Sequence, residues 1–218
     1  MKTRHIIFDC DGVLVDSEPI SMRADVQLLQ RYGIEISEAE AHQRFVGTTF
    51  QAMLDMMTTQ HGVVFPEGLH EVKNRMVEDM YRRELQIVDG VIDVLTALRT
   101  KGLTFSIASN SPRDRVELAV ELTGIAKYFD AISTYQDVKH GKPAPDVFLK
   151  AAERAGMAPV QCLVVEDSIT GVTAALAANI RTYGFVGTHQ QPAVHAEALK
   201  SLGVAVTLQT MAELLHHI

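Results

Sequence analysis

The sequence predicts an α/β fold, with a Rossmann-like parallel sheet core that carries helices on both faces and an inserted four-helix cap domain. From residue 88 onward, short apolar runs alternate with segments of helical periodicity, as in sheets built from parallel crossovers. Between an N-terminal apolar run and this region, residues 16–85 contain helical patterns and no convincing strand. We therefore expect a sheet-forming core from residues 1–15 and 86–218 and a cap domain from residues 16–85.

The composition is that of an ordinary globular protein. Of the 218 residues, 47% are hydrophobic and 22% are charged, and the formal net charge is -7. Nucleic acid is disfavoured as the main partner because phosphate backbones are bound by clustered lysines and arginines. Cys10 and Cys162 fit buried thiols better than a disulfide framework. No apolar run approaches membrane-spanning length and no secretory pattern is seen, so we expect a cytoplasmic protein without membrane contact, with a monomer as the default.

The first strand and the acids that follow it are the main functional signal. Residues 6–8 form an apolar run, and Asp9, Cys10 and Asp11 come directly after it. Along extended backbone Asp9 and Asp11 point to one side and Cys10 to the other. Ligands of open parallel sheets gather at the carboxyl ends of strands, so both acids stand where chemistry is expected. The alternative interpretation is an Asp-Gly turn that leaves a strand, since both residue types are common turn formers.

The cap domain is expected to contain four helices. Apolar residues at helical spacing predict the first over residues 18–32. Two capping boxes predict the starts of the next two helices, and they are Ser37 with Glu40 and Thr48 with Gln51. The fourth is expected over residues 66–85, where a proline suits the first turn. Because the insertion follows the first strand, we expect it to act as a lid over the strand ends.

The remaining chain alternates between the two element types. The expected strands cover residues 103–108, 131–134, 162–165, 181–186 and 204–208. The expected helices cover residues 90–100 and 111 to about 124. Two more follow, one from the 142–145 loop to about residue 155 and one from the end of the 162–165 strand to about residue 178. A last helix begins at residue 211. This alternation implies parallel strands joined by right-handed crossovers.

Polar side chains follow four of the predicted strands. After the acids of the first strand come Ser109 with Asn110, then Lys142, then Glu166 with Asp167. Taken alone, Lys142 is better explained as a solvated loop charge and Asn110 as a turn residue. Because parallel strand ends meet at one edge of the sheet, we expect the side chains to converge. Carboxylates without His or Cys suit a hard cation such as Mg²⁺, while a hydroxyl and a lysine suit a phosphoryl group, so the set predicts phosphoryl transfer.

With these residues the sequence resembles the haloacid dehalogenase (HAD) superfamily of phosphotransferases. The four motifs of that superfamily are matched in order by residues 9–17, Ser109 in Ala108-Ser109-Asn110, Lys142 in residues 141–146, and residues 166–168. The resemblance covers essentially the whole chain, and the helical insertion looks like the four-helix cap of the family. It implies a phosphoric monoester hydrolase, similar to sugar-phosphate phosphatases and beta-phosphoglucomutase-like proteins.

The resemblance also implies roles for single residues. Asp9 would be the nucleophile that becomes an aspartyl-phosphate, and Asp11 would act first as acid and then as base. Lys142 would balance the charges of the nucleophile and the phosphoryl group. Ser109 and the amide of Asn110 would hold phosphoryl oxygens.

The resemblance further implies a Mg²⁺ site. The ion would be bound by the Asp9 carboxylate, the Asp11 backbone carbonyl and Asp167, with Glu166 acting through water. Its charge would let two anions, carboxylate and phosphate, approach each other.

Within the superfamily, hydrolysis of a phosphate ester is favoured. Dehalogenating members lack the second aspartate, which is present here as Asp11. Phosphomutases carry a histidine near the position of Ser21 and an arginine where this chain has Phe50, and both are missing here. A phosphomutase or a phosphoglycolate phosphatase is the alternative enzyme, and a non-catalytic phosphate-binding regulator is disfavoured by the intact acids and lysine.

Selection of a small phosphorylated substrate is expected in the cap. The candidate contacts to sugar hydroxyls are Gly47, Thr48, Thr49 and Gln51, although a helix cap equally explains Thr48 and Gln51. Five basic residues could bind a carboxylated substrate but are mostly expected on a solvated helix face, and they are Arg44, Lys73, Arg75, Arg82 and Arg83. The pattern most resembles phosphatases of sugar and sugar-acid phosphates, including 6-phosphogluconate.

Two further residue types are expected to serve packing. The nine histidines show no ligand spacing with Cys or with one another, which favours surface or core positions over a transition-metal site. Met53, Met56 and Met57 stand at near-helical spacing and are expected to pack inside the cap.

Overall fold

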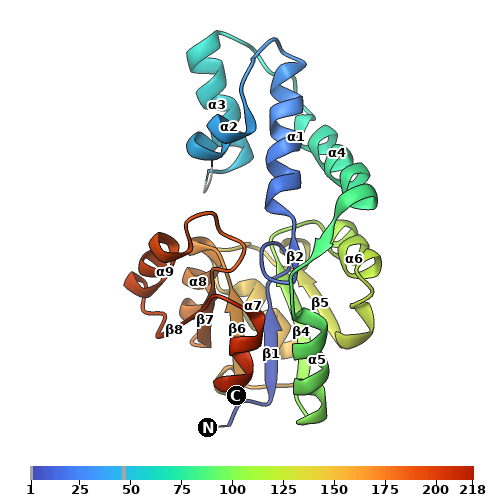
Figure 1. Cartoon of the computed structure of the whole chain (residues 1–218), viewed down its shortest axis with the longest axis vertical. Helices are drawn as coiled ribbons and strands as arrows, with labels where there is room; N and C mark the ends of the chain where they lie inside the picture. The colour runs from blue at the N-terminus through green and yellow to red at the C-terminus, as the bar shows by residue number, and fades with distance from the viewer. Residues whose placement is uncertain (1, 46–47) are drawn as a thin grey trace. The chain divides into compact units, whose positions relative to one another are not determined.

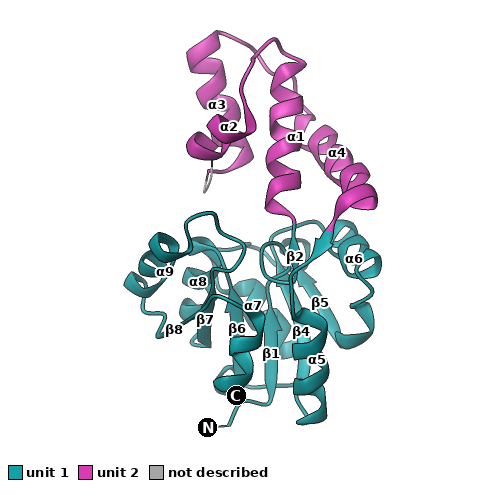
Figure 2. Ribbon diagram, in the orientation of Figure 1, with its two compact units in different colours: residues 1–16, 86–218 teal, residues 17–85 magenta. Residues whose placement is uncertain are grey.

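The computed structural model describes residues 2–45 and 48–218. The chain forms two compact units, one from Met1–Asp16 with Gln86–Ile218 and the other from Ser17–Leu85 (Figure 2). The first unit is built around a parallel sheet, and the second unit is helical. That the helical unit works as a cap stays a prediction.

The sheet of the first unit contains six parallel strands in the order β5-β4-β1-β6-β7-β8 (Figure 1). Their bounds are His5–Phe8 for β1, Thr104–Ser109 for β4, Ala131–Thr134 for β5, Cys162–Glu166 for β6, Arg181–Phe185 for β7 and Val206–Leu208 for β8. The first strand lies in the interior of the sheet, where Phe8 is opposite both Ile107 and Val165. The predicted α/β class and its parallel sheet are confirmed.

Helices connect the strands and cover the sheet. Five are α-helical, with bounds Val91–Thr100 for α5, Arg113–Leu122 for α6, Asp146–Arg154 for α7, Ile169–Ala177 for α8 and Pro192–Ser201 for α9. Four are short 3₁₀ turns, with bounds Ala126–Tyr128 for η1, Tyr135–Asp137 for η2, Pro159–Gln161 for η3 and Met211–His216 for η4. On one face α7 and α8 pack on the sheet, where Phe148 and Ala174 join Ile7 and Val164 in a buried cluster. The helix α5 packs against η4 in front of the strands as seen in Figure 1.

Three elements of this unit differ from the sequence prediction. A two-stranded antiparallel ribbon, β2 (Val15–Asp16) with β3 (Gln86–Ile87), was not predicted because two residues carry no readable periodicity. Helix α9 was missed because its sequence buries only Leu199 and so lacks an apolar stripe. The last predicted helix is a 3₁₀ turn, η4, which ends after six residues.

The second unit contains the four predicted helices. Their bounds are Glu18–Gln30 for α1, Glu38–Phe45 for α2, Phe50–His61 for α3 and Leu69–Glu84 for α4. The capping box predicted at Thr48 is wrong, because Thr49 caps α3 by accepting a 3.1 Å hydrogen bond from the Ala52 amide. The predicted start of the fourth helix at residue 66 is also early, since α4 begins only after Gly68, which adopts a left-handed conformation. Met53 and Met57 are buried in the core of this unit, as predicted.

Two expectations from composition bear on the described residues. No helix in residues 2–45 and 48–218 combines the length and apolar character needed to cross a membrane. Cys10 and Cys162 are both buried free thiols. Burial raises the pKa of Cys10 well above its usual value and that of Cys162 to about 11, so neither thiol is activated as a nucleophile.

Candidate active site

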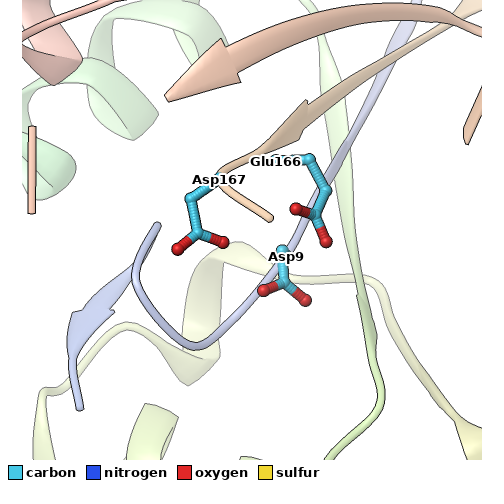
Figure 3. Close-up of side chains that lie close together, drawn as sticks. All are labelled: Asp9, Glu166 and Asp167. Atoms are coloured by element: carbon cyan, nitrogen blue, oxygen red, sulfur yellow. The ribbon is translucent and has the colours of Figure 1, made fainter. Parts of the chain in front are cut away.

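Three carboxylates meet at the carboxyl edge of the sheet. Asp9 follows β1, Glu166 ends β6, and Asp167 comes next in the chain. The neighbouring strands hold them together, since the Asp9 amide donates a 2.9 Å hydrogen bond to the Val165 carbonyl. One carboxylate oxygen from each residue lies within 4.8 Å of the others (Figure 3). The expected convergence of the first and fourth motifs is therefore present in this structure.

Lys142 joins two of these acids from the loop before α7. Its Nζ donates to Asp9 Oδ1 at 2.6 Å and to Glu166 Oε1 at 2.7 Å. Asn110 holds the lysine backbone from both sides, because its Oδ1 accepts from the Lys142 amide at 2.8 Å and its Nδ2 donates to the Lys142 carbonyl at 3.0 Å. Lys142 is thus a buried ion-pair partner and not a solvated loop charge. The Asn110 side chain positions this lysine, while phosphate binding by the Asn110 backbone amide stays a prediction.

Burial and charge control protonation in this cluster. Burial raises the pKa of the Asp9 carboxyl well above its usual range, Lys142 opposes the shift, and Glu166 and Asp167 add to it. Burial lowers the pKa of Lys142, but the carboxylates of Asp9 and Glu166 outweigh this effect and raise that pKa above its ordinary value. Lys142 is therefore a cation at neutral pH. When all three acids are ionised, one ammonium does not neutralise them, and this excess of negative charge favours a bound cation.

Asp11 lies in a second polar chain beside the cluster. Its Oδ2 accepts a 2.5 Å hydrogen bond from Ser111 Oγ, and Arg115 Nη2 donates to the same hydroxyl at 2.6 Å. Ser109, at the end of β4, is buried and accepts a 2.9 Å hydrogen bond from the Ser111 amide. Sequence reasoning found Asp11 and Ser109 but missed Ser111 and Arg115, which orient the Asp11 carboxylate.

Two glycines leave room for the carboxylates of Asp167 and Glu166, which lie against the backbone of Gly12 and Gly171. Gly12 has a φ of 77°, and a Cβ there would lie 2.2 Å from Asp167 Oδ2. A Cβ on Gly171, in the first turn of α8, would lie 1.6 Å from Glu166 Oε1. Neither separation is tolerated by real atoms, so each site requires glycine.

The sequence as a whole was compared with known proteins. The family described as haloacid dehalogenase-like hydrolase matches residues 6–185. The chain belongs to the haloacid dehalogenase-like hydrolases. The 6-phosphogluconate phosphatase of Escherichia coli (strain K12) is 29% identical to it, over 87% of this chain and 86% of the relative. A phosphorylated carbohydrates phosphatase of Thermotoga maritima is 30% identical, over 83% of this chain and 84% of the relative.

Solved structures agree with this membership. A conserved haloacid dehalogenase-like protein of unknown function from Agrobacterium tumefaciens superposes with a TM-score of 0.85 at 32% identity, covering 99% of this chain and 97% of its own. The family match and the curated relatives together identify the enzyme class. The chain is a HAD-like phosphatase, a phosphoric monoester hydrolase.

HAD-like hydrolases typically use Mg²⁺, and the donor atoms of the cluster fit such an ion. Asp9, Glu166 and Asp167 offer only oxygen, the donor that Mg²⁺ prefers. Both oxygens of Glu166 already have partners, because Oε1 accepts from Lys142 and Oε2 accepts from the Ser168 amide at 2.5 Å. Asp9 and Asp167 are consequently better placed than Glu166 to bind a cation directly.

Two histidines that the sequence did not indicate as site residues contact Asp167 at the edge of this HAD-like site. His189 Nε2 lies 3.3 Å from Asp167 Oδ2, and His195 Nε2 lies 2.5 Å from the Asp167 backbone carbonyl. Their rings stack on each other with centroids 3.6 Å apart. No ligand spacing in the sequence could reveal them, because they lie after β7 and in α9 and reach Asp167 only through the fold.

The candidate substrate contacts of the cap have different outcomes. Gly47 lies outside the residues that the structure describes. Thr48 and Thr49 line a pocket of the helical unit. Gln51 is exposed and donates a 2.8 Å hydrogen bond to Asp55 within α3. The expectation of a solvated face is wrong for Lys73, whose side chain is only 11% exposed.

Proposed function

We propose that this HAD-like phosphatase hydrolyses phosphate monoesters of small phosphorylated sugars or sugar acids, with Mg²⁺, through a covalent aspartyl-phosphate on Asp9. The observation that carries this proposal is the buried contact of Lys142 with both Asp9 and Glu166, next to Asp167. An ammonium and a carboxylate suited to bind a metal, both beside one nucleophile, form the electrostatic arrangement that phosphoryl transfer requires. The similarity to a 6-phosphogluconate phosphatase and to a phosphorylated carbohydrates phosphatase supports the substrate class.

The residues divide the reaction between them. A carboxylate oxygen of Asp9 attacks phosphorus, and the bond from phosphorus to the ester oxygen breaks. Asp11 gives its proton to that leaving oxygen, then takes a proton from the water that attacks the aspartyl-phosphate. Hydrolysis releases inorganic phosphate and returns both carboxyl groups to their starting states. Ser111 fixes the Asp11 carboxylate for both transfers through its 2.5 Å hydrogen bond.

Charge balance is the task of the remaining site residues. Lys142 compensates the Asp9 carboxylate and the incoming phosphoryl group. Asp9, Asp167 and the Asp11 backbone carbonyl would hold Mg²⁺, which would supply the further positive charge that lets the two anions approach. Ser109 and the amide of Asn110 hold phosphoryl oxygens. Glu166 keeps Lys142 in place through its 2.7 Å contact and would act on the ion through water.

Selection of the organic part of the substrate is assigned to the helical unit. The charged site residues of the sheet unit are assigned to the metal and to the phosphoryl group, which is common to all phosphate esters. The helical unit contains its own polar pocket, which can distinguish one organic group from another.

Turnover by an Asp9→Asn variant tests the proposal. The amide cannot attack phosphorus, so hydrolysis should fall at least about a thousandfold. The assay uses sugar phosphates, 6-phosphogluconate, phosphoglycolate and nucleotides with Mg²⁺. The variant should still show a cooperative thermal unfolding transition, which demonstrates that it folds. Asp130→Asn, an exposed acid of the same unit that pairs with Arg99, is the matched control and should remain active. Persistent hydrolysis by purified Asp9→Asn would refute the nucleophile. Release of an isomeric sugar phosphate without inorganic phosphate would identify a mutase.

A further inference from the structure

A pocket of about 170 Å³ lies entirely within the helical unit. Its polar lining consists of Glu18, Ser21, Asp25, Thr48, Thr49 and Lys73. These side chains come from α1, the segment before α3, and α4, so the pocket depends on the packing of several helices. The volume accommodates several water-sized groups, and the lining offers mainly hydroxyls and carboxylate oxygens.

A buried ion pair forms one wall of this pocket. Lys73 Nζ lies 2.7 Å from Asp25 Oδ1 and donates to Asp25 Oδ2 at 2.8 Å. Both side chains are only 11% exposed. The ammonium also lies 4.8 Å from the centroid of the Phe50 ring, which adds a cation–π contact. The charge of Lys73 is therefore compensated within the protein before any ligand arrives.

This pairing sets the charge of the pocket. With Asp25 and Lys73 cancelling each other, the carboxylate of Glu18 is the remaining charge in the lining, and its partner His42 stands 3.7 Å away. Among the described lining residues, no cation is left for a carboxylate or second phosphate of a ligand. An anionic group would lose its hydration here without gaining a countercharge, which is costly. Hydroxyl groups of a ligand, in contrast, find acceptors and donors.

We infer that this pocket selects the uncharged, hydroxyl-bearing end of a phosphorylated polyol or sugar, and that Asp25 excludes substrates with a second anionic group. The inference rests on the proposed phosphatase function and narrows it from sugars and sugar acids to neutral ones. Asp25 acts by cancelling the charge of Lys73, so removal of its charge alone should open the pocket to carboxylates. The substrate preference of this chain would thereby differ from that of its 29% identical Escherichia coli relative, a 6-phosphogluconate phosphatase.

A matched pair of substrates isolates this effect. D-glucitol 6-phosphate and D-gluconate 6-phosphate differ only at C1, where one has a hydroxymethyl group and the other a carboxylate. The experiment measures kcat/KM for both with Mg²⁺ in the wild type and in three variants, with p-nitrophenyl phosphate as a substrate that reports on the catalytic machinery alone. The variants are Asp25→Asn, Lys73→Gln and, as control, Glu84→Gln, which breaks the exposed pair of Arg23 and Glu84 between the same two helices.

The wild type should prefer glucitol 6-phosphate at least about tenfold, as expected for an unpaired buried charge. Asp25→Asn should lower this preference at least about tenfold, because Lys73 becomes available to the carboxylate. Lys73→Gln should raise it several-fold, since Asp25 then repels the carboxylate without compensation. Glu84→Gln should leave it unchanged.

The outcomes distinguish a failure of the proposed phosphatase function from a failure of the inferred substrate selection. Failure of the wild type to hydrolyse any ester, p-nitrophenyl phosphate included, would overturn the proposed function and this inference with it. Hydrolysis with a preference for gluconate 6-phosphate would overturn the inference alone, as would an unchanged preference in a folded Asp25→Asn protein. If thermal unfolding shows that Asp25→Asn does not fold, the wild-type preference and the direction of change in Lys73→Gln decide.

Discussion

At the scale of single residues, Gly171 determines where Glu166 can stand. A methyl group at this position would overlap the Glu166 carboxylate, whose two oxygens bind Lys142 and the Ser168 amide and leave it no room to move. Gly171→Ala should therefore lower the stability by about 1–3 kcal/mol through overpacking, although alanine normally favours a helix over glycine by about 1 kcal/mol. It should also lower kcat/KM at least about tenfold, because Lys142 moves with its partner.

Urea unfolding and kcat/KM measured on the same preparations check this expectation. Thr173→Ala is the control, since Thr173 is exposed on the same helix and its replacement also introduces a good helix former. A Gly171→Ala enzyme with the stability gain of an ordinary glycine-to-alanine change and full activity would show that Glu166 is not fixed in place.

The site residues differ in how far sequence alone could find them. Asp9, Lys142 and Asp167 were predictable because each follows a strand and parallel strand ends share an edge. The two hydrogen bonds from the Asn110 side chain to the Lys142 backbone were not predictable, because they depend on side-chain geometry between two loops. The position of Lys73 was wrongly predicted, since a basic residue on an amphipathic helix is usually solvated and only the fold places Asp25 against it.

At the scale of elements, Asp137 ties together the end of β5 and two helices. Its carboxylate contacts Arg113 of α6 at 2.7 Å and Arg154 of α7 at 2.9 Å, and it accepts from the Thr134 amide at 2.7 Å. The hydrogen bond from Arg154 and the neighbouring donors hold the pKa of Asp137 well below its usual range, although burial opposes the shift. A depressed pKa stabilises the fold above the unfolded-state pKa of about 3.9, and the contribution is lost as pH falls toward the folded-state pKa.

Asp137→Asn should accordingly lower the free energy of unfolding by about 1–2 kcal/mol at pH 7. The loss is limited to this range because Arg113 and Arg154 are partly exposed and solvent screens their charges. The difference from the wild type should shrink progressively below about pH 4, where the unfolded carboxyl binds a proton. Urea unfolding between pH 7 and pH 3 measures this trend. Glu117→Gln is the matched control, because Glu117 pairs with the same Arg113 at 3.3 Å but is 55% exposed, so its loss should cost less than about 0.5 kcal/mol at either pH. A difference for Asp137→Asn that grows on acidification would contradict the assignment.

At the scale of the whole molecule, metal binding should be visible as stability. A cation that binds only the folded protein stabilises it by about 2.7 kcal/mol at a hundred times its Kd. Added Mg²⁺ should raise the Tm in proportion to the logarithm of its concentration, and EDTA should reverse the rise. Asp167→Asn should reduce the Mg²⁺-dependent shift, while Asp130→Asn, outside the cluster, should keep it. A Tm insensitive to Mg²⁺ would show that the carboxylates of Asp9, Glu166 and Asp167 do not form the ion's site.

The overall fold was more predictable than its details. The strands β1 and β6 at the centre of the sheet are short, largely apolar and fully buried, so their positions were expected to within about two residues. The β2–β3 ribbon lacked such a signal because the pairing of its two short strands defines it. Helix α9 lacked it because its sequence has no apolar stripe, so its position depends on the neighbouring elements. Elements that are stabilised by their own burial pattern can be found from sequence, and elements that depend on distant partners cannot.

The interior position of β1 has a consequence for synthesis on the ribosome. Of the six strands of the sheet, β1 is synthesised first, yet both of its neighbours, β4 and β6, lie downstream of the helical unit at Thr104–Ser109 and Cys162–Glu166. Residues 17–85 form a unit with a core of their own, and this unit is complete before either neighbour emerges. The nascent chain thus contains its nucleophile well before it contains Lys142, Glu166 and Asp167, which are made only after the helical unit and the strands β4 and β5.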